Sequence, residues 1–209
     1  MRWLWRLLFA PGCLICKRQT EGDFCAACEA DFRPLSGPLC PWCSQPVRGD
    51  GPCARCRVQA PLFDGLTCPY EHRGAVKKAL HLLKFQRRRA LARPLGERLA
   101  AVFVPQPGEA IVPVPLHAAR QRERGFNQAE LLARLLPGPV HPEYLRRTHA
   151  TAHQYQQSDA VRLANVLRAF EAGPVKGQRI VLVDDIMTTG ATLNACAETL
   201  RAAGALTVR

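Results

Sequence analysis

Two adjacent carboxylates, Asp184 and Asp185, stand between a run of apolar residues at 180–183 and a run of small and hydroxyl residues. The apolar run is rich in β-branched residues, which predicts a buried parallel strand. Ligands bind outside the carboxyl ends of such strands. Small residues after the strand let backbone N–H groups approach a phosphate, and carboxylates accept hydrogen bonds from sugar hydroxyls or hold Mg²⁺. The pattern therefore predicts a ribose-5-phosphate site.

The predicted phosphate loop leads into a helix that we expect from Leu193 to about Ala203. Free N–H groups and the positive dipole end at the start of a helix favour an anion. The residues expected to cradle the 5-phosphate are Thr188, Thr189, Gly190, Ala191 and Thr192. Residues 180–192 resemble, at every position, the phosphoribosyl-pyrophosphate (PRPP) signature of type I phosphoribosyltransferases. A strand that merely ends in Asp and a helix that merely starts with Thr would explain only part of this ordered set.

Eight of the ten cysteines form four successive C-x-x-C pairs. Each pair places two thiolates on one side of a tight turn, and two pairs complete a tetrahedral, structural zinc site without an open position. The nearly equal segments that separate the pairs favour two zinc ribbons in series, although an interleaved pairing also fits the spacing. In series, the zinc ligands are Cys13, Cys16, Cys25 and Cys28 at the first site and Cys40, Cys43, Cys53 and Cys56 at the second.

A disulfide framework is the competing interpretation of the paired cysteines. The C-x-x-C pairing itself and the lack of a recognisable secretion signal in the first residues argue against it. Cys68 and Cys196 fall outside the pattern and are expected to be ordinary buried thiols.

The formal net charge is +12. A zinc ion with four thiolates carries a charge of −2, so two such sites would leave a net charge of about +8. The basic excess lies in segment 71–150, which holds 15 basic and 6 acidic residues. Two clusters dominate it: Lys77, Lys78, Lys84, Arg87, Arg88, Arg89 and Arg93, and then Arg120, Arg122 and Arg124. Such a surface suits pyrophosphate, nucleic acid or both, and the alternative is an ordinary solvated face.

The middle of the chain is predicted to supply a second strand end beside the first. An edge strand at Gly65–Tyr70 and helices at about Gly74–Leu83 and Leu91–Phe103 precede a strand at Ala110–Pro115. The prolines of that strand lead into an exposed loop. The basic segment that follows it opens a helix running to about Leu136.

This second strand end is the candidate pyrophosphate site, because loop N–H groups bind phosphate oxygens and guanidinium forks neutralise them. Its expected residues are Pro115, Leu116, His117, Arg120, Arg124 and Lys84. A hood over the reacting groups is expected in the long polar stretch 146–157, whose residues 154–157 either touch a base or face solvent. A short helix at the start of the chain is expected to dock through Trp3, Leu4 and Leu7.

With these motifs in order along nearly the whole chain, the sequence resembles the ComF family. The matching stretches are the four C-x-x-C pairs, Leu83–Phe85, Ala92–Leu95, Val112–Pro115, Arg124–Gln128, Leu145–Thr148, Gln154, Arg162, Asn165–Val166, Ala169–Phe170 and 180–192. The resemblance implies an α/β fold in two domains. A double zinc ribbon with two structural Zn²⁺ occupies 1–60, and a type I phosphoribosyltransferase-like parallel sheet flanked by helices occupies 61–209. PRPP with Mg²⁺ would be the ligand, held by Asp184 and Asp185 as catalytic carboxylates.

The resemblance further implies a cytoplasmic protein that supports DNA uptake in natural transformation. Its partners would be PRPP, single-stranded DNA and proteins of the uptake machinery. The alternative is an active phosphoribosyltransferase that acts on a nucleobase or another amine acceptor in nucleotide metabolism or salvage. A third interpretation makes the zinc module a platform for docking proteins. No apolar stretch approaches the ~20 residues of a membrane-spanning helix, so no membrane span is expected.

Overall fold

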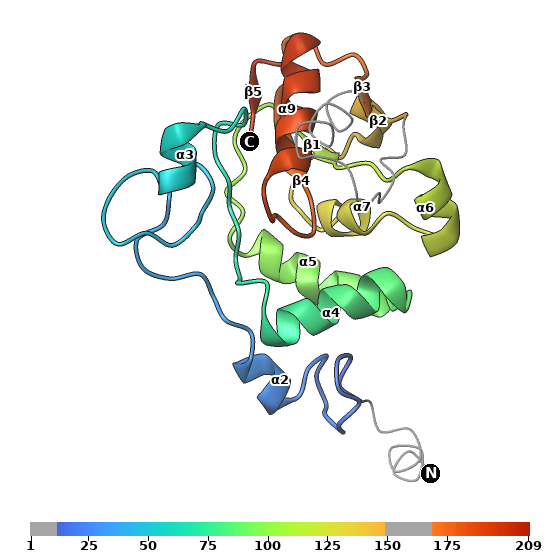
Figure 1. The fold of residues 1–209 in the computed structure, drawn as a ribbon. Coiled ribbons are helices and arrows are strands. Elements are labelled where there is room, and N and C mark those ends of the chain that lie inside the picture. The colour runs from blue at the N-terminus through green and yellow to red at the C-terminus, as the bar shows by residue number, and fades with distance from the viewer. Residues whose placement is uncertain (1–11, 149–168) are drawn as a thin grey trace, which may run out of the picture.

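The computed structural model describes residues 12–148 and 169–209 (Figure 1). The helix expected around Trp3, Leu4 and Leu7 lies outside these residues, as does the hood expected at 146–157 beyond Thr148. The helices are α2 (Ala26–Ala30), α3 (Ala54–Val58), α4 (Gly74–Phe85), η1 (Arg89–Leu91), α5 (Ala92–Ala100), α6 (Ala118–Arg124), α7 (Gln128–Ala133), η2 (Pro142–Tyr144) and α9 (Ala191–Ala202). The strands are β1 (Glu109–Pro113), β2 (Leu145–Arg147), β3 (Phe170–Ala172), β4 (Arg179–Val183) and β5 (Thr207–Val208).

Three parallel strands form the central sheet in the order β1-β4-β5, and β2 pairs with β3 in a separate antiparallel ribbon. Ile111 of β1 lies opposite Val181 of β4, and Ile180 of β4 lies opposite Val208 of β5. Every residue of β1 is buried, as expected for parallel strands covered on both faces. The predicted strands at 110–115 and 180–183 are therefore confirmed as neighbours.

Helices cover both faces of the central sheet. Successive residues of a strand point to opposite faces, so each strand contributes side chains to the cores on both sides. Ile111, Val181 and Val183 share one hydrophobic core with α4, α5 and α7. Val112 and Ile180 share a second core with α9. Figure 1 shows α9 on the opposite side of the sheet from α4 and α5. The predicted α/β architecture, a parallel sheet flanked by helices, is confirmed.

The edge strand predicted at Gly65–Tyr70 does not form, and its last residue makes only an isolated bridge with Pro34. The backbone of this segment bonds to the cysteine-rich region instead: Leu66 O accepts a hydrogen bond of 2.6 Å from Ser44 Oγ. Pro69 has no N–H to donate to a ladder. The segment therefore links the cysteine-rich region to the sheet domain without joining the sheet.

The single helix predicted from the basic segment to Leu136 is two helices, α6 and α7. Gly125 follows α6 at φ 81°, the left-handed conformation that ends helices. Asn127 then caps α7, since its side-chain oxygen accepts a 3.0 Å hydrogen bond from a backbone N–H of the first turn. The helix predicted at Leu91–Phe103 is also shorter than expected, since α5 ends at Ala100.

The first part of the cysteine-rich region shares a hydrophobic core with α4 and α5, and Figure 1 shows α2 beside α4. Arg98 carries much of this contact: its guanidinium lies 2.5 Å from a Glu29 carboxylate oxygen and 4.8 Å from the ring centroids of Phe24 and Phe32. Such stacking places a delocalised cation on aromatic faces, which stabilises the contact beyond the ion pair alone. In the part of the chain that the structure describes, no helix is long and apolar enough to cross a membrane.

Candidate functional site

Asp184 and Asp185 lie at the carboxyl end of β4, beside the end of β1. Val114 N, just after β1, donates a 2.9 Å hydrogen bond to Val183 O, which holds the two strand ends together. Asp185 N donates a 2.8 Å hydrogen bond to its neighbour's carboxylate, Asp184 Oδ1. The structure thus places the predicted carboxylates at the sheet edge where ligands bind in open α/β folds.

Asp185 is the centre of a buried polar chain. Lys84 Nζ, from the last turn of α4, lies 2.5 Å from Asp185 Oδ2, and the two side chains are 18% and 3% exposed. This contact is an ion pair without hydrogen-bond alignment. Gln128 Nε2 donates to Asp185 Oδ1 at 3.2 Å, and Arg124 Nη1 donates to Gln128 Oε1 at 2.8 Å. Lys84 and Arg124, both predicted basic residues, are therefore brought to the carboxylates.

Gln128 is a site residue that sequence reasoning did not assign. It begins α7, and its neighbour Asn127 both caps that helix and donates from Nδ2 to Val114 O at 3.0 Å. One local motif thus fixes the end of β1 and directs an amide at Asp185. The family stretch Arg124–Gln128 was the available signal for this role.

Asp184 is a perturbed carboxyl. Burial, and then the negative charge of Asp185, raise the pKa of Asp184 to about 8, while Lys84 opposes the shift. A divalent cation or sugar hydroxyls would stabilise the ionised form of Asp184 and so oppose the rise of its pKa. The oxygen donors fit Mg²⁺, a hard cation that binds proteins through one or two carboxylates and takes its other ligands from water and phosphate.

Three arginines contribute positive charge near the carboxylates. Arg124 interacts with the charge of Asp185, Arg147 interacts with that of Asp184, and Arg120 interacts with both of the other arginines. Arg120 and Arg124 lie on α6, and Arg147 ends β2; all three are partly buried. Burial lowers the pKa of both Arg124 and Arg147, and the positive charge of Arg120 lowers both further. Such a group of cations, in which one charge lowers the pKa values of the other two, is suited to bind a multiply charged anion such as pyrophosphate. Arg147 was not predicted as a site residue.

Three further predicted residues precede the helix that carries two of these arginines. Pro115, Leu116 and His117 are partly buried and connect β1 to α6. His117 caps α6, because Nδ1 accepts a 3.3 Å hydrogen bond from Ala119 N. Its observed role is structural, and the imidazole supports the helix that carries Arg120 and Arg124.

The predicted phosphate loop connects β4 to α9. Thr188 and Thr189 are exposed, whereas Ala191 and Thr192 are partly buried at the start of α9. Gly190 is buried with φ 78°, a left-handed conformation that a residue with a Cβ rarely adopts. The loop thus places exposed hydroxyls and the N-terminal end of a long helix at one point, as phosphate binding requires.

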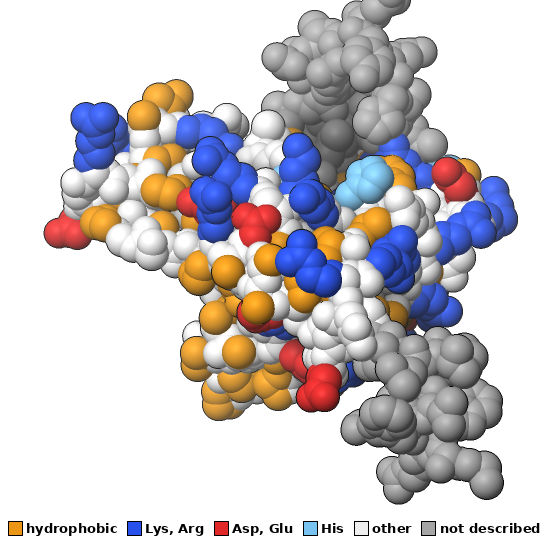
Figure 2. Space-filling model, turned by 90° about the horizontal axis from the view of Figure 1, so that it is seen from below, with side chains coloured by type: hydrophobic (Ala, Val, Ile, Leu, Met, Phe, Trp, Pro, Cys, Tyr) orange, Lys and Arg blue, Asp and Glu red, His pale blue; other side chains and the backbone are white. Residues whose placement is uncertain are grey.

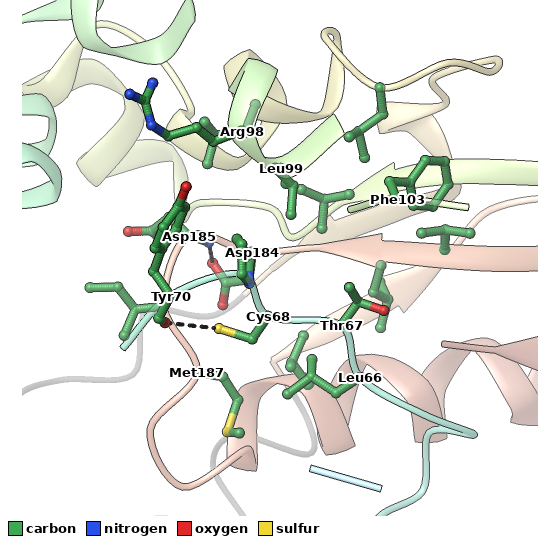
Figure 3. Close-up of a pocket in the computed structure, with 18 of the residues that line it drawn as sticks. Leu66, Thr67, Cys68, Tyr70, Arg98, Leu99, Phe103, Asp184, Asp185 and Met187 are labelled. Carbon is green, nitrogen blue, oxygen red and sulfur yellow. Dashed lines mark hydrogen bonds between the residues drawn. The ribbon is translucent and has the colours of Figure 1, made fainter. Parts of the chain in front are cut away.

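A cavity of about 390 Å³ extends from the carboxylates along the sheet (Figure 3). Leu66, Cys68 and Tyr70 line one side, and Leu99 and Phe103 line the other, with Asp184 and Asp185 at one end. Its mainly apolar lining is unsuitable for phosphate and compatible with a flat, apolar group. Sequence reasoning missed this cavity because its walls come from segments far apart in the chain.

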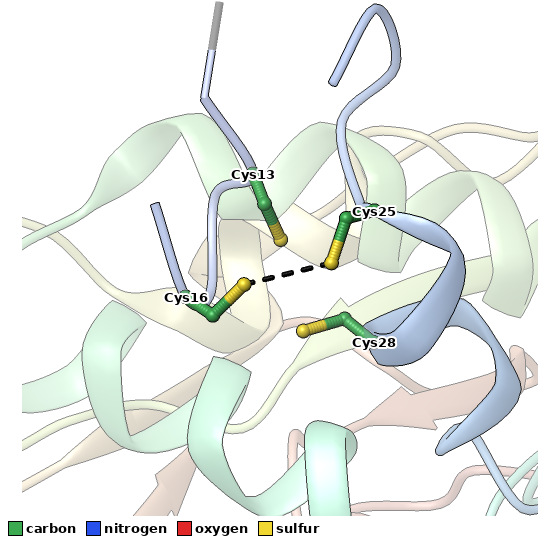
Figure 4. Close-up of side chains that lie close together, drawn as sticks. All are labelled: Cys13, Cys16, Cys25 and Cys28. Carbon is green, nitrogen blue, oxygen red and sulfur yellow. Dashed lines mark hydrogen bonds between the residues drawn. The ribbon is translucent and has the colours of Figure 1, made fainter. Parts of the chain in front are cut away.

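The eight paired cysteines form two clusters of four, Cys13/Cys16/Cys25/Cys28 and Cys40/Cys43/Cys53/Cys56. Within each cluster the sulfur atoms lie within 4.8 Å of one another, and the cysteines are free thiols. Tetrahedral Zn²⁺ with Zn–S bonds of about 2.3 Å separates its sulfurs by about 3.8 Å, so both clusters fit the ion. In the first cluster, two sulfurs from different pairs lie 3.5 Å apart (Figure 4). The serial pairing is confirmed over the interleaved one. Of the two other cysteines, Cys196 is buried as predicted and Cys68 is only partly buried.

The second cluster adjoins the phosphate loop. Arg55, on α3, donates from Nη1 to Thr189 O at 3.0 Å. Met187 packs against the apolar surface formed by Cys40, Cys43 and Cys56. The contact is invisible in the sequence because it joins segments more than 130 residues apart.

The comparisons with known proteins agree with this organisation. The chain matches the model of the double zinc ribbon domain at residues 4–57 and that of the phosphoribosyl transferase domain at residues 122–209. The DNA utilization protein YhgH of Shigella flexneri is 33% identical over 99% of this chain and 93% of its own length. The competence protein ComFC of Bacillus subtilis is 27% identical over 90% of this chain and 88% of its own.

A slighter likeness is found among solved structures. The glutamine PRPP amidotransferase from Bacillus subtilis, solved with ADP and GMP, has 22% identity and a TM-score of 0.43, over 63% of this chain and 30% of its own. This likeness is too slight to bear on function. Family membership instead follows from the two domain models and from the full-length similarity to YhgH. The chain belongs to the ComF family, in which a double zinc ribbon precedes a phosphoribosyltransferase domain.

Proposed function

We propose that this protein binds PRPP with Mg²⁺ at the carboxyl end of β4 and supports the uptake or use of DNA through that site and a basic surface. The observation that carries the proposal is the carboxylate pair, Asp184 and Asp185, in which Asp185 contacts Lys84 and both carboxylates interact with the charges of arginines on α6 and β2. Each chemical group of PRPP has a matching partner here. The carboxylates suit the ribose hydroxyls, the cations suit the pyrophosphate, and the helix start that contains a glycine suits the 5-phosphate.

The roles follow from the chemistry of each group. Asp184 and Asp185 bind the ribose hydroxyls and the Mg²⁺, and residues 188–192 cradle the 5-phosphate. The 115–117 backbone, with Arg120 and Arg124, binds pyrophosphate. Lys84 neutralises Asp185 in the free protein and is free to turn toward pyrophosphate once Mg²⁺ takes over that charge. Residues 1–60 and 61–209 form the zinc-binding and PRPP-binding units.

The DNA part of the proposal rests on charge and on the relatives' names. Lys77, Lys78, Arg87, Arg89 and Arg122 are exposed on α4, α6 and the turn between α4 and α5. Figure 2 shows Lys and Arg side chains spread over one face of the molecule. Basic surfaces bind nucleic acid through phosphate contacts. Relatives are named for DNA utilization and for competence, so single-stranded DNA and cytoplasmic proteins of the uptake machinery are the proposed partners.

An active phosphoribosyltransferase is the second candidate. The cavity that ends at Asp184 and Asp185 favours it, because an apolar space beside the ribose site suits a flat nucleobase acceptor. Transfer would pass through an oxocarbenium-like state as pyrophosphate leaves, and Arg120 and Arg124 would stabilise the leaving charge.

Calorimetry with PRPP and Mg²⁺ tests the ligand. We expect binding to the wild type and none to the Asp184→Asn, Asp185→Asn double variant; unchanged affinity would refute the site. Pyrophosphate release from PRPP, measured with nucleobases and with single-stranded DNA, separates the two candidates. Binding to single-stranded DNA should weaken steeply with salt. A lack of DNA binding at low salt, with turnover of a nucleobase, would favour the enzyme.

A further inference from the structure

We propose that Arg55 is a positioning residue for the phosphate loop and that it couples zinc binding at the second cysteine cluster to PRPP binding. The inference rests on the proposed function for this loop and adds a role for the zinc ribbon in it. The second cluster is Cys40, Cys43, Cys53 and Cys56.

Arg55 joins the zinc cluster to the loop. Nη1 donates to Thr189 O at 3.0 Å and reaches Thr188 O at 3.5 Å. In the chain, Arg55 lies between Cys53 and Cys56, two of the predicted zinc ligands of the second cluster.

Met187 forms a second contact between the same two elements. Its side chain packs against the cluster formed by Cys40, Cys43 and Cys56, two residues after Asp185. Gly190, at the other end of the loop, lies against Met187 Sδ and Phe63, which a Cβ at Gly190 would meet at 3.8 and 3.9 Å. The loop is therefore held between the zinc ribbon and the linker that follows it.

Metal binding determines how well this contact can form. Zinc ribbons acquire their fold with the metal, so the position of α3 depends on zinc. Zinc with four thiolates carries a charge of −2, which attracts the Arg55 guanidinium. A positioned guanidinium fixes the backbone of 188–189 and places positive charge beside the 5-phosphate. Since coupling between two sites is reciprocal, a ligand on the loop must also strengthen zinc binding.

The first cluster offers no such route. Its segment contacts α5 through Asp23–Arg93 and Glu29–Arg98 ion pairs. Among the described residues, the phosphate loop contacts the cysteine-rich region through the second cluster and its helix. Coupling is therefore specific to one of the two metal sites.

Arg55→Ala tests the inference, with Arg57→Ala as the matched control. Both arginines are exposed on α3, but Arg57 Nη1 donates to Pro52 O within the ribbon and not to the loop. We expect Arg55→Ala to weaken PRPP·Mg²⁺ binding about three- to tenfold, the range of a single exposed hydrogen-bonding cation. Arg55→Lys should recover part of the affinity, and Arg57→Ala should match the wild type. Metal analysis should find two zinc per chain in all variants.

A ligand-free measurement keeps the inference separate from the proposed function. Zinc release to a chelator should be faster from one of the two sites in Arg55→Ala than in Arg57→Ala. In the wild type, PRPP with excess Mg²⁺ should slow that release. Equal PRPP affinities in the two variants, or equal zinc-release rates, would overturn the inference. If the wild type fails to bind PRPP, the proposed function fails, and unequal ligand-free release rates would still support the Arg55 contact.

Discussion

Replacing Asp184 by Asn should stabilise the ligand-free protein at neutral pH while removing a carboxylate that we propose binds PRPP and Mg²⁺. Burial, and then the charge of Asp185, raise the pKa of Asp184 from 3.8 to about 8. A carboxyl group whose pKa is higher in the folded state takes up a proton on folding. The free energy of unfolding therefore falls as the pH rises between the unfolded and folded pKa values. Asn fills nearly the same space without this ionisation.

The size of the effect follows from the pH window. Each pH unit inside it changes the free energy of unfolding by about 1.4 kcal/mol. Between pH 5 and pH 7, the advantage of Asp184→Asn over the wild type should thus grow by at most about 2.8 kcal/mol. Residue 184 is partly open to solvent, and Lys84 opposes the shift, so we expect a growth of roughly 1–2 kcal/mol.

Denaturant unfolding at pH 5, 6 and 7 measures this difference. Glu198→Gln, an exposed change on α9, is the control and should show no growing advantage. Loss of zinc at low pH affects all three proteins alike, because both cysteine clusters are unchanged, so variants are compared at each pH. PRPP with Mg²⁺ should stabilise the wild type and not Asp184→Asn. An advantage of Asp184→Asn that is the same at pH 5 and pH 7 would refute a raised pKa at this residue.

Three further predictions concern the support of the site, its cations and its metals. Arg209→Ala should lower the free energy of unfolding by about 2–3 kcal/mol, because it leaves the buried Glu109 carboxylate without the guanidinium that pairs with both of its oxygens; a loss under 0.5 kcal/mol in urea unfolding would contradict this. Arg120→Ala should weaken PRPP binding about tenfold in calorimetry without changing the unfolding midpoint. Metal analysis should give two zinc per chain, and chelation should remove the near-ultraviolet circular dichroism of the ribbons; one zinc per chain would contradict the two-cluster assignment.

Local patterns explain which parts of the site the sequence could predict. The β4 strand, its two carboxylates, the phosphate loop and α9 are contiguous, so their order already fixes their placement. The C-x-x-C pairs are also local, and near-equal spacing favoured the serial clusters that the structure confirms. The broken basic helix had a local cause as well, since Gly125 and Asn127 are ordinary helix-ending and helix-starting residues.

Contacts between segments far apart in the chain could not be predicted from the sequence. Lys84 was assigned to the basic set, but its ion pair with Asp185 depends on how α4 packs against the sheet. The failure of the predicted strand at 65–70 depends on its bonding to the cysteine-rich region. The cavity beside the carboxylates likewise exists only once these segments enclose it.

By itself, the sequence determined the chemistry that this protein carries: eight thiols in metal-binding pairs, two carboxylates at a strand end, and a loop suited to phosphate. These follow from residue type and short-range spacing, which act along the chain. Only the tertiary structure decided which cations face the carboxylates and that the second zinc ribbon contacts the phosphate loop through Arg55. Burial and long-range packing set those contacts, because they depend on side chains brought together from far apart in the sequence.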